Sequence, residues 1–244
     1  MQTPTHTLLA LALLSKSSNS DESDAAVFGD GDTAPNAKTR KRNLAIFFGS
    51  LIPDIAIYLW APYQSIVNGV SGKEMWGELY FQAPMQNLIA WFNSVPIYAL
   101  LALIGYIAWS KTWMKLLLVL ALASIIHVYA LLALIGFLIW AKTWGKLLLF
   151  FALAALTHMA TDFPVHADDA YRHFWPISDW RYYSKFSYWD GDYHAVWVSR
   201  FESVLALGCI AILWQRFSRH IVKIVLGLLT LFYILILAAP LFFG

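Results

Sequence analysis

Long apolar stretches separated by short polar ones are the feature that most limits what this chain can fold into. The 244 residues are 59% hydrophobic and only 13% charged, about half the charged fraction of a typical soluble domain. The apolar runs cover residues 43–61, 91–110, 113–141, 144–161, 200–215 and 221–243. A bilayer core accepts neither isolated charges nor unpaired backbone groups, so this pattern predicts an all-α, polytopic bundle of membrane helices.

The polar stretches punctuate what we expect to be a single membrane-embedded domain, residues 1–244. Residues 4–15 form a short apolar helix with no preceding Lys or Arg, which indicates a helix kept in the mature protein and not a signal peptide. Residues 16–42 are rich in Ser, Asp and Gly, and predict a mobile polar loop. Residues 162–199 predict an extramembrane loop that is dense in His, Asp and aromatic residues.

Charge and cysteine content narrow the range of partners. A net charge of +2 is too small to indicate binding to nucleic acid. The single cysteine, Cys209, lies in an apolar run and predicts no disulfide. Several of the twelve tryptophans sit where apolar runs end, as an interfacial belt would place them, so the expected partner is membrane lipid.

An internal repeat lies in the middle of the chain. Residues 97–127 and 128–158 align without a gap, with 20 of 31 positions identical. Each unit has the pattern helix, Lys-Thr-Trp turn, helix, and the matched turn exceeds what chance similarity between Leu/Ala-rich helices produces. We therefore interpret the pair as a 31-residue tandem duplication.

The chemistry-bearing residues gather around the end of the second unit. His158 and Asp162 are four residues apart, so a helix would place them on one face, and Pro164 should end that helix. Imidazole and carboxylate groups together suit zinc or another divalent metal. Nearby polar residues that extend this cluster are His166, Asp169, His173, Asp190 and His194.

The duplication supplies an internal control for this site. His127 is the repeat mate of His158, but Leu131 and Ile135 stand where Asp162 and His166 would be. The first copy therefore has a histidine without its partners, and only the second copy can build the site.

Three short motifs, taken together, resemble the bacterial family of predicted membrane-bound metal-dependent hydrolases. The motifs are Thr5-His6, Gly49-Ser-Leu-Ile-Pro-Asp54, and His158-Met-Ala-Thr-Asp162 followed by Phe174-Trp-Pro-Ile-Ser-Asp179. The chain is also distantly similar to the zinc-dependent phospholipase C superfamily. The likeness covers most of the chain outside residues 16–42 and the extra repeat unit.

The resemblance implies a function and a set of roles. Its metal ligands would be His6, Asp54, His158 and Asp162, and its reaction would be hydrolysis of an ester or phosphoester in the bacterial inner membrane. Access to the site from the bilayer surface favours a lipid or lipid-linked substrate, and the imidazole and carboxylate donors favour zinc as the divalent metal. Residues expected to supply a second metal, to support the ligands or to transfer protons are His166, His173, His194, Asp169 and Asp190, with Glu202 as a further second-metal candidate.

Two questions stay open at this point. The same cluster would serve a non-enzymatic scaffold, or a protein that handles metal ions or protons, although its place at a helix end favours an enzyme over a transporter. The aromatic residues of the second polar loop either stack on a sugar or lipid headgroup or pack the loop onto the membrane: Tyr182, Tyr183, Phe186, Tyr188 and Trp189.

The expected membrane topology makes it difficult to combine the extra repeat unit with a single site. Basic residues favour the cytoplasmic side, which places Lys38–Arg42 inside and the site outside. For Asp54 and Asp162 to meet, residues 114–141 must leave the inner face and return to it. We expect them to break near Ser124–His127 as a re-entrant or paired segment, because one straight helix would separate the two aspartates.

The cluster predicts bound metal in the purified protein. We expect roughly one or two equivalents of zinc or a similar ion, lost in Asp162→Ala and kept in His127→Ala, as measured by elemental analysis. Equal metal content in the two variants would show that the second copy does not hold the ligands.

Overall fold

The computed structural model describes residues 2–16, 37–109 and 142–243, and within them it is all-helical, without a strand. The predicted helical class is therefore confirmed. Parts of several predictions lie outside the described residues: most of the 16–42 loop, much of the repeat 97–127 and 128–158, the fold of 114–141, and His127, Leu131 and Ile135.

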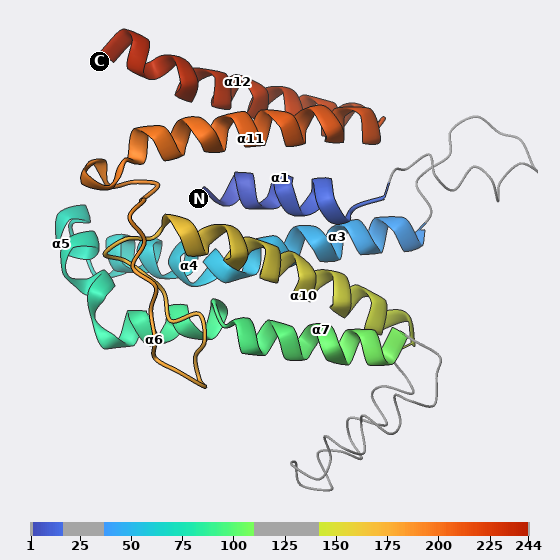
Figure 1. Ribbon diagram of the computed structural model, residues 1–244, viewed down its shortest axis with the longest axis horizontal. Coiled ribbons are helices and arrows are strands. Elements are labelled where there is room, and N and C mark those ends of the chain that lie inside the picture. The colour runs from blue at the N-terminus through green and yellow to red at the C-terminus, as the bar shows by residue number, and fades with distance from the viewer. Residues whose placement is uncertain (1, 17–36, 110–141, 244) are drawn as a thin grey trace, which may run out of the picture.

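The helices follow one another as a bundle of long rods with short connecting turns (Figure 1). The first part contains α1 (Thr3–Leu14), α3 (Ala37–Leu51), the 3-10 turn η1 (Ile52–Asp54), α4 (Ile55–Pro62) and the π-turn η2 (Tyr63–Val67). Next come α5 (Gly72–Gly77), η3 (Leu79–Phe81), α6 (Ala83–Phe92) and α7 (Val95–Trp109). The last part contains α10 (Lys142–Asp162), η4 (Phe163–Val165), η5 (Gly191–Tyr193), α11 (Ala195–Arg216) and α12 (His220–Phe243).

Five helical stretches among the described residues are long and apolar enough to cross a membrane, which is consistent with a membrane protein. They are Thr39–Val67, Ala83–Trp109, Trp144–Val165, Ala195–Arg216 and His220–Ala238. Three begin well before the predicted apolar runs: α3 starts at Ala37 instead of residue 43, the stretch with α6 and α7 starts at Ala83 instead of residue 91, and α11 starts at Ala195 instead of residue 200. Residues 62–90, which lie between two of the predicted apolar runs, contain α5 and most of α6.

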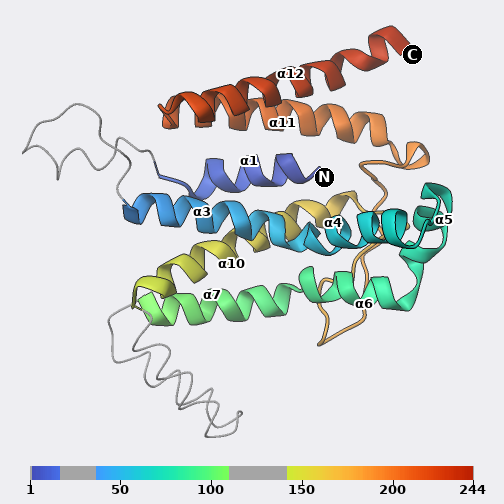
Figure 2. The same cartoon turned by 180° about the vertical axis from the view of Figure 1, so that it is seen from behind.

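The two ends of the bundle differ in charge. The start of α3, the start of α10, the end of α11 and the start of α12 lie at one end (Figures 1 and 2). These helix ends carry basic residues: Arg40, Lys41, Arg42, Lys146, Arg216, Arg219 and Lys223. The start of α1, the end of α10 and α4 lie toward the opposite end. Asp54 and Asp162 are consequently on the same side of the bundle, away from the basic end.

Helix α10 lies in the middle of the bundle and packs against α7, α3 and α1. Two glycine contacts allow this close packing. A Cβ placed on Gly49 of α3 would lie 2.1 Å from the backbone oxygen of Phe151, and one on Gly105 of α7 would lie 2.5 Å from the backbone nitrogen of Leu149. Small residues at such contacts let membrane helices approach backbone to backbone.

Helix α1 is held at both of its ends by α11. Glu202 accepts hydrogen bonds from the Gln2 backbone N–H and the Thr5 hydroxyl, each at 2.6 Å. Arg216 Nη1 donates to the backbone oxygens of Leu11 and Ala12 at the other end, at 3.0 and 2.8 Å. An acid at the N-terminus and a base at the C-terminus satisfy the free backbone groups of a helix and complement its dipole.

Residues 163–194 form a cap over the site end of the bundle. Their backbone is tied together by hydrogen bonds from Ser184 N to His166 O and from Tyr188 N to Val165 O, at 2.9 and 3.2 Å. Arg181 Nη1 donates to the Ala170 backbone oxygen at 2.6 Å. The cap is therefore an ordered part of the structure, in contact with the helix ends.

The contact at Gly49 predicts a large effect from a small change. In Gly49→Ala, the added methyl group collides with backbone atoms of α10, which cannot rotate away, so we expect a loss of about 1–3 kcal/mol of stability. Gly208→Ala on α11 is the matched control, because among the described residues its added Cβ would meet nothing within 4 Å outside its own helix, and we expect no loss of stability but a gain of up to about 1 kcal/mol from the higher helix propensity of alanine. Thermal unfolding of the two variants, side by side in detergent, measures the difference.

Candidate metal centre

The last turn of α10 supplies two side chains to the centre of the site. His158 and Asp162 are one helical turn apart, and His158 Nε2 lies 3.1 Å from Asp162 Oδ2. The α-helix ends at Asp162, two residues before Pro164, as the sequence predicts. Both side chains are fully buried, so each requires a compensating partner.

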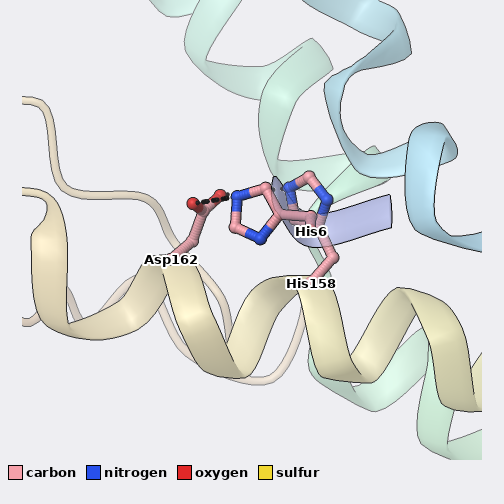
Figure 3. Close-up of side chains that lie close together, drawn as sticks. All are labelled: His6, His158 and Asp162. Atoms are coloured by element: carbon pink, nitrogen blue, oxygen red, sulfur yellow. Dashed lines mark hydrogen bonds and ion pairs between the residues drawn. The ribbon is translucent and has the colours of Figure 1, made fainter. Parts of the chain in front are cut away.

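The N-terminal helix brings a third group to the same point. His6 Nε2 lies 2.8 Å from Asp162 Oδ1, and the rings of His6 and His158 stack with their centroids 3.8 Å apart. Figure 3 shows the three side chains gathered, with His6 arriving from α1 and the other two from α10. Helix α1 is thus an integral part of the site.

Asp54 completes one side of the cluster. It ends the 3-10 turn η1, at the Pro53 interruption between α3 and α4, and its Oδ1 lies 3.3 Å from His158 Nε2. Its Oδ2 accepts a hydrogen bond from the Thr3 hydroxyl, which in turn accepts one from Tyr58 at 2.7 Å. The four sequence-predicted ligands therefore meet in one place.

A fifth group comes from the cap. His166 Nε2 lies 3.5 Å from Asp162 Oδ1, and its Nδ1 lies 2.8 Å from Asp169 Oδ2. Burial opposes protonation of this imidazole, but Asp162 and Asp169 outweigh it and raise the pKa of His166 to about 9. The sequence placed His166 and Asp169 in supporting roles, and the structure brings both to the cluster.

The three histidines share one orientation. In each ring, Nδ1 meets a hydrogen-bond acceptor: the Ser50 backbone oxygen at 2.7 Å for His158, the Thr161 hydroxyl at 2.7 Å for His6, and Asp169 for His166. The Thr161 hydroxyl directs its own hydrogen to backbone oxygens of α10, so its oxygen is free to accept. In the neutral form of each ring the single proton is therefore on Nδ1, and Nε2 faces Asp162 as a bare acceptor.

This orientation is the one that metal-binding histidines adopt. Such a histidine donates its second ring nitrogen to a carbonyl, hydroxyl or carboxylate, which fixes the tautomer and the ring direction. A bare Nε2 and a carboxylate oxygen at 2.8–3.5 Å repel one another unless a proton or a cation lies between them. Ligand atoms of His6, His158 and Asp162 all lie within 4.8 Å of one another, close enough to hold one metal ion.

Ser50 and Thr161 are the functional residues that the sequence reasoning missed. Both lie inside motifs already singled out, directly after Gly49 and directly before Asp162. The signal that identifies Thr161 is spacing, because residues 158, 161 and 162 share one helix face. Ser50 acts through its backbone oxygen, for which the sequence holds no signal.

The remaining predicted residues lie further from the cluster. His173 is buried, donates from Nδ1 to the Asn93 backbone oxygen at 3.2 Å, and packs against Tyr171 and Phe163. Burial lowers the pKa of His173 to about 4, so this ring is neutral at physiological pH. The structure does not bring His194 or Asp190 to the site: His194 is exposed where α11 begins, and Asp190 caps the η5 turn by accepting from the Asp192 N–H.

A cavity of about 380 Å³ opens beside the cluster, and we name it the site cavity. Its polar walls are formed by Asp54, Asp162, His166, Tyr171 and Tyr188. Burial raises the pKa of both tyrosines well above the usual range, so their hydroxyls stay protonated and available as donors. A small polar group in this cavity would therefore meet carboxylates, an imidazole and hydroxyl donors.

Comparison with known proteins assigns no family to the chain. No family model, no curated protein and no solved structure matches it.

The arrangement predicts that Thr161 supports metal binding through His6. Thr161→Val removes the Thr161 hydroxyl that accepts from His6 Nδ1 and so weakens the fixed direction of the ring, and we expect a loss of about 10- to 100-fold in metal affinity. Competition with a chelating dye measures this.

Thr157→Val is the matched control, one turn earlier on the same helix, because the Thr157 hydroxyl donates to the Leu153 backbone oxygen of its own helix. An equal loss of affinity in the two variants would contradict the role assigned to Thr161.

Proposed function

We propose that this protein is a membrane-embedded, metal-dependent hydrolase that acts on an ester or phosphoester of a lipid or lipid-linked substrate. The observation that carries the proposal is the convergence of three Nε2 atoms on Asp162, with Asp54 beside His158 and with Asp54, Asp162 and His166 lining one cavity. Three His and two Asp donors suit zinc and other divalent first-row metals. The same residues underlie the resemblance to membrane-bound metal-dependent hydrolases.

The site residues have two proposed roles: some would bind the metal ion, and others would take part in the hydrolysis. His6, His158 and Asp162 are the most buried and would hold the metal, with Asp54 and His166 on the cavity side. Such an ion supplies a bound water with a pKa near 7 and polarises the scissile oxygen. Asp54, at the cavity edge, accepts the proton of the attacking water, while the Tyr171 and Tyr188 hydroxyls donate to the oxygens on which negative charge develops.

A lipid substrate follows from a second hollow next to the site cavity. An apolar groove of about 510 Å³ runs between α1, α3, α11 and α12, and it shares Thr3, Pro4 and Tyr58 with the site cavity. Its other walls are almost entirely aliphatic and aromatic, including Leu8, Phe47, Val225 and Leu229. A hydrocarbon chain in the groove would place its polar end at the metal cluster.

The position of the cluster favours hydrolysis over transport. A transporter needs its polar groups between helices near the bilayer midplane, whereas this cluster lies where α10 ends and the cap begins. The basic residues at the opposite end of the bundle support an orientation with that end in the cytoplasm and the site at the outer face of a bacterial inner membrane.

Metal-dependent hydrolysis is the direct test of the proposal. We expect purified protein to release product from a fluorogenic lipid ester or lipid phosphodiester, to lose this activity with a chelator, and to regain it with zinc. Asp54→Asn should lower kcat by about 100-fold or more, because the proton acceptor is lost. Asp168→Asn, an exposed acid in the cap, is the control and should keep full activity.

Substitutions in the apolar groove test whether the substrate is a lipid. Val225→Trp fills the apolar groove, whereas Leu228→Trp on the same helix lies outside it. Activity on a long-chain substrate should fall only in Val225→Trp, and activity on a short-chain analogue should fall in neither variant. Full metal occupancy without hydrolysis of any of these substrates would remove the hydrolase proposal and leave a metal-handling protein.

A further inference from the structure

A third hollow, on the other side of the site cavity, has a different lining. It has a volume of about 270 Å³ and shares Ile57 and Tyr188 with the site cavity. We name it the aromatic cavity, because its remaining walls are formed by Trp76, Tyr80, Phe81, Trp189 and Asp169. Five of its seven lining residues are thus aromatic, and one is an acid.

The acid in this wall has an unsatisfied oxygen. Asp169 is 4% exposed. Its Oδ2 accepts from the Trp189 indole N–H at 3.1 Å and faces His166 Nδ1 at 2.8 Å. Its Oδ1 is buried and has no hydrogen-bond partner within the described residues. A buried carboxylate oxygen without a partner is costly, so this wall favours a ligand that compensates it.

The surroundings of Asp169 select the kind of ligand. Tyr80 contacts both Trp76 and Phe81, with ring centroids 5.8 and 5.2 Å apart, so the rings form a continuous aromatic wall. Aromatic faces attract cations, and a set of aromatic rings with one carboxylate is the kind of site that binds a methylated or primary ammonium group. The small volume suits such a group and excludes a bulky one.

We propose that the aromatic cavity binds an organic ammonium group, with Asp169 as its counter-ion and Trp76, Tyr80, Phe81, Tyr188 and Trp189 as its aromatic walls. Trp76, Phe81 and Trp189 are each about half exposed, so the cavity can be reached from outside the bundle. Helix α5 and η3, which carry the first three rings, lie at the site end of the molecule (Figure 1), where a bilayer presents its headgroups.

The order of the three hollows indicates which part of a substrate the ammonium group would be. The apolar groove, the site cavity and the aromatic cavity share walls in that order. A phospholipid has the same order: a hydrocarbon chain, a phosphodiester and, in some classes, an amine. The identification of the ammonium group as part of a substrate headgroup rests on the proposed hydrolase function. The ammonium-binding site itself does not rest on that function.

Binding is tested with small probes on the full chain. The protein is placed in nanodiscs of phosphatidylglycerol, which carry no ammonium group, and titrated with choline by calorimetry. The neutral carbon isostere 3,3-dimethylbutan-1-ol and glucose are titrated in parallel. We expect choline to bind and the two neutral compounds not to bind.

Two variants remove the two parts of the site. Asp169→Asn keeps the shape and removes the charge, so choline binding should be lost. Trp76→Leu removes one aromatic wall without touching the metal cluster, and should weaken binding by roughly three- to thirtyfold, the range of a cation–π contact. Trp197→Leu, an exposed tryptophan outside the cavity, is the control and should bind choline like the wild type.

Each other outcome overturns the ammonium site. Equal binding of the neutral isostere would make the cavity merely apolar, and binding of glucose alone would make it a sugar site. Absence of choline binding in a protein that retains metal would also overturn it. Binding is measured separately from turnover, so the two proposals can fail independently. Choline binding without hydrolysis would contradict only the proposed hydrolase function. Hydrolysis without choline binding would contradict only the ammonium site.

Discussion

The buried carboxylate of Asp162 is the group on which the arrangement of this bundle depends. It lies at the end of an apolar helix, where an uncompensated charge would be severely destabilising. Three imidazole nitrogens from three separate segments approach its two oxygens within 3.5 Å. Helix α1, α10 and the cap are therefore tied together by one electrostatic requirement, and loss of any partner weakens the compensation of the buried carboxylate.

Backbone packing sets the precision of that cluster. Gly49 lets α3 approach α10 until their backbones touch, and the next residue, Ser50, then presents its carbonyl oxygen to His158. Three residues later, Pro53 interrupts the helix and Asp54 follows at the cavity. The short motif from Gly49 to Asp54 thus performs three tasks in sequence: close approach, orientation of a ring, and delivery of a carboxylate.

The sequence predicted much of this because membrane helices follow strong rules. Apolar runs located the helices, and the four-residue spacing of His158 and Asp162 placed them on one face. The boundaries of α3 and α11 were wrong by several residues, because amphipathic helix ends extend past the apolar run. Ser50 and the unsatisfied oxygen of Asp169 were beyond prediction: the first acts through its backbone, and the second depends on how the cap folds back.

The antiparallel packing of α7 and α10 bears on how a chain of this kind can accommodate an extra sequence unit. Gly105 and Gly145 lie at one helix contact, although α7 comes from the first sequence unit and α10 from the second. Residues 111–141, which separate them, number 31, one full period of the sequence identity. A shorter chain that joined Ser110 to Lys142 would read Trp-Ser-Lys-Thr-Trp, as residues 109–113 do now. Because α7 ends and α10 begins at the same end of the bundle (Figure 1), the two helices could keep their antiparallel arrangement in such a shorter chain.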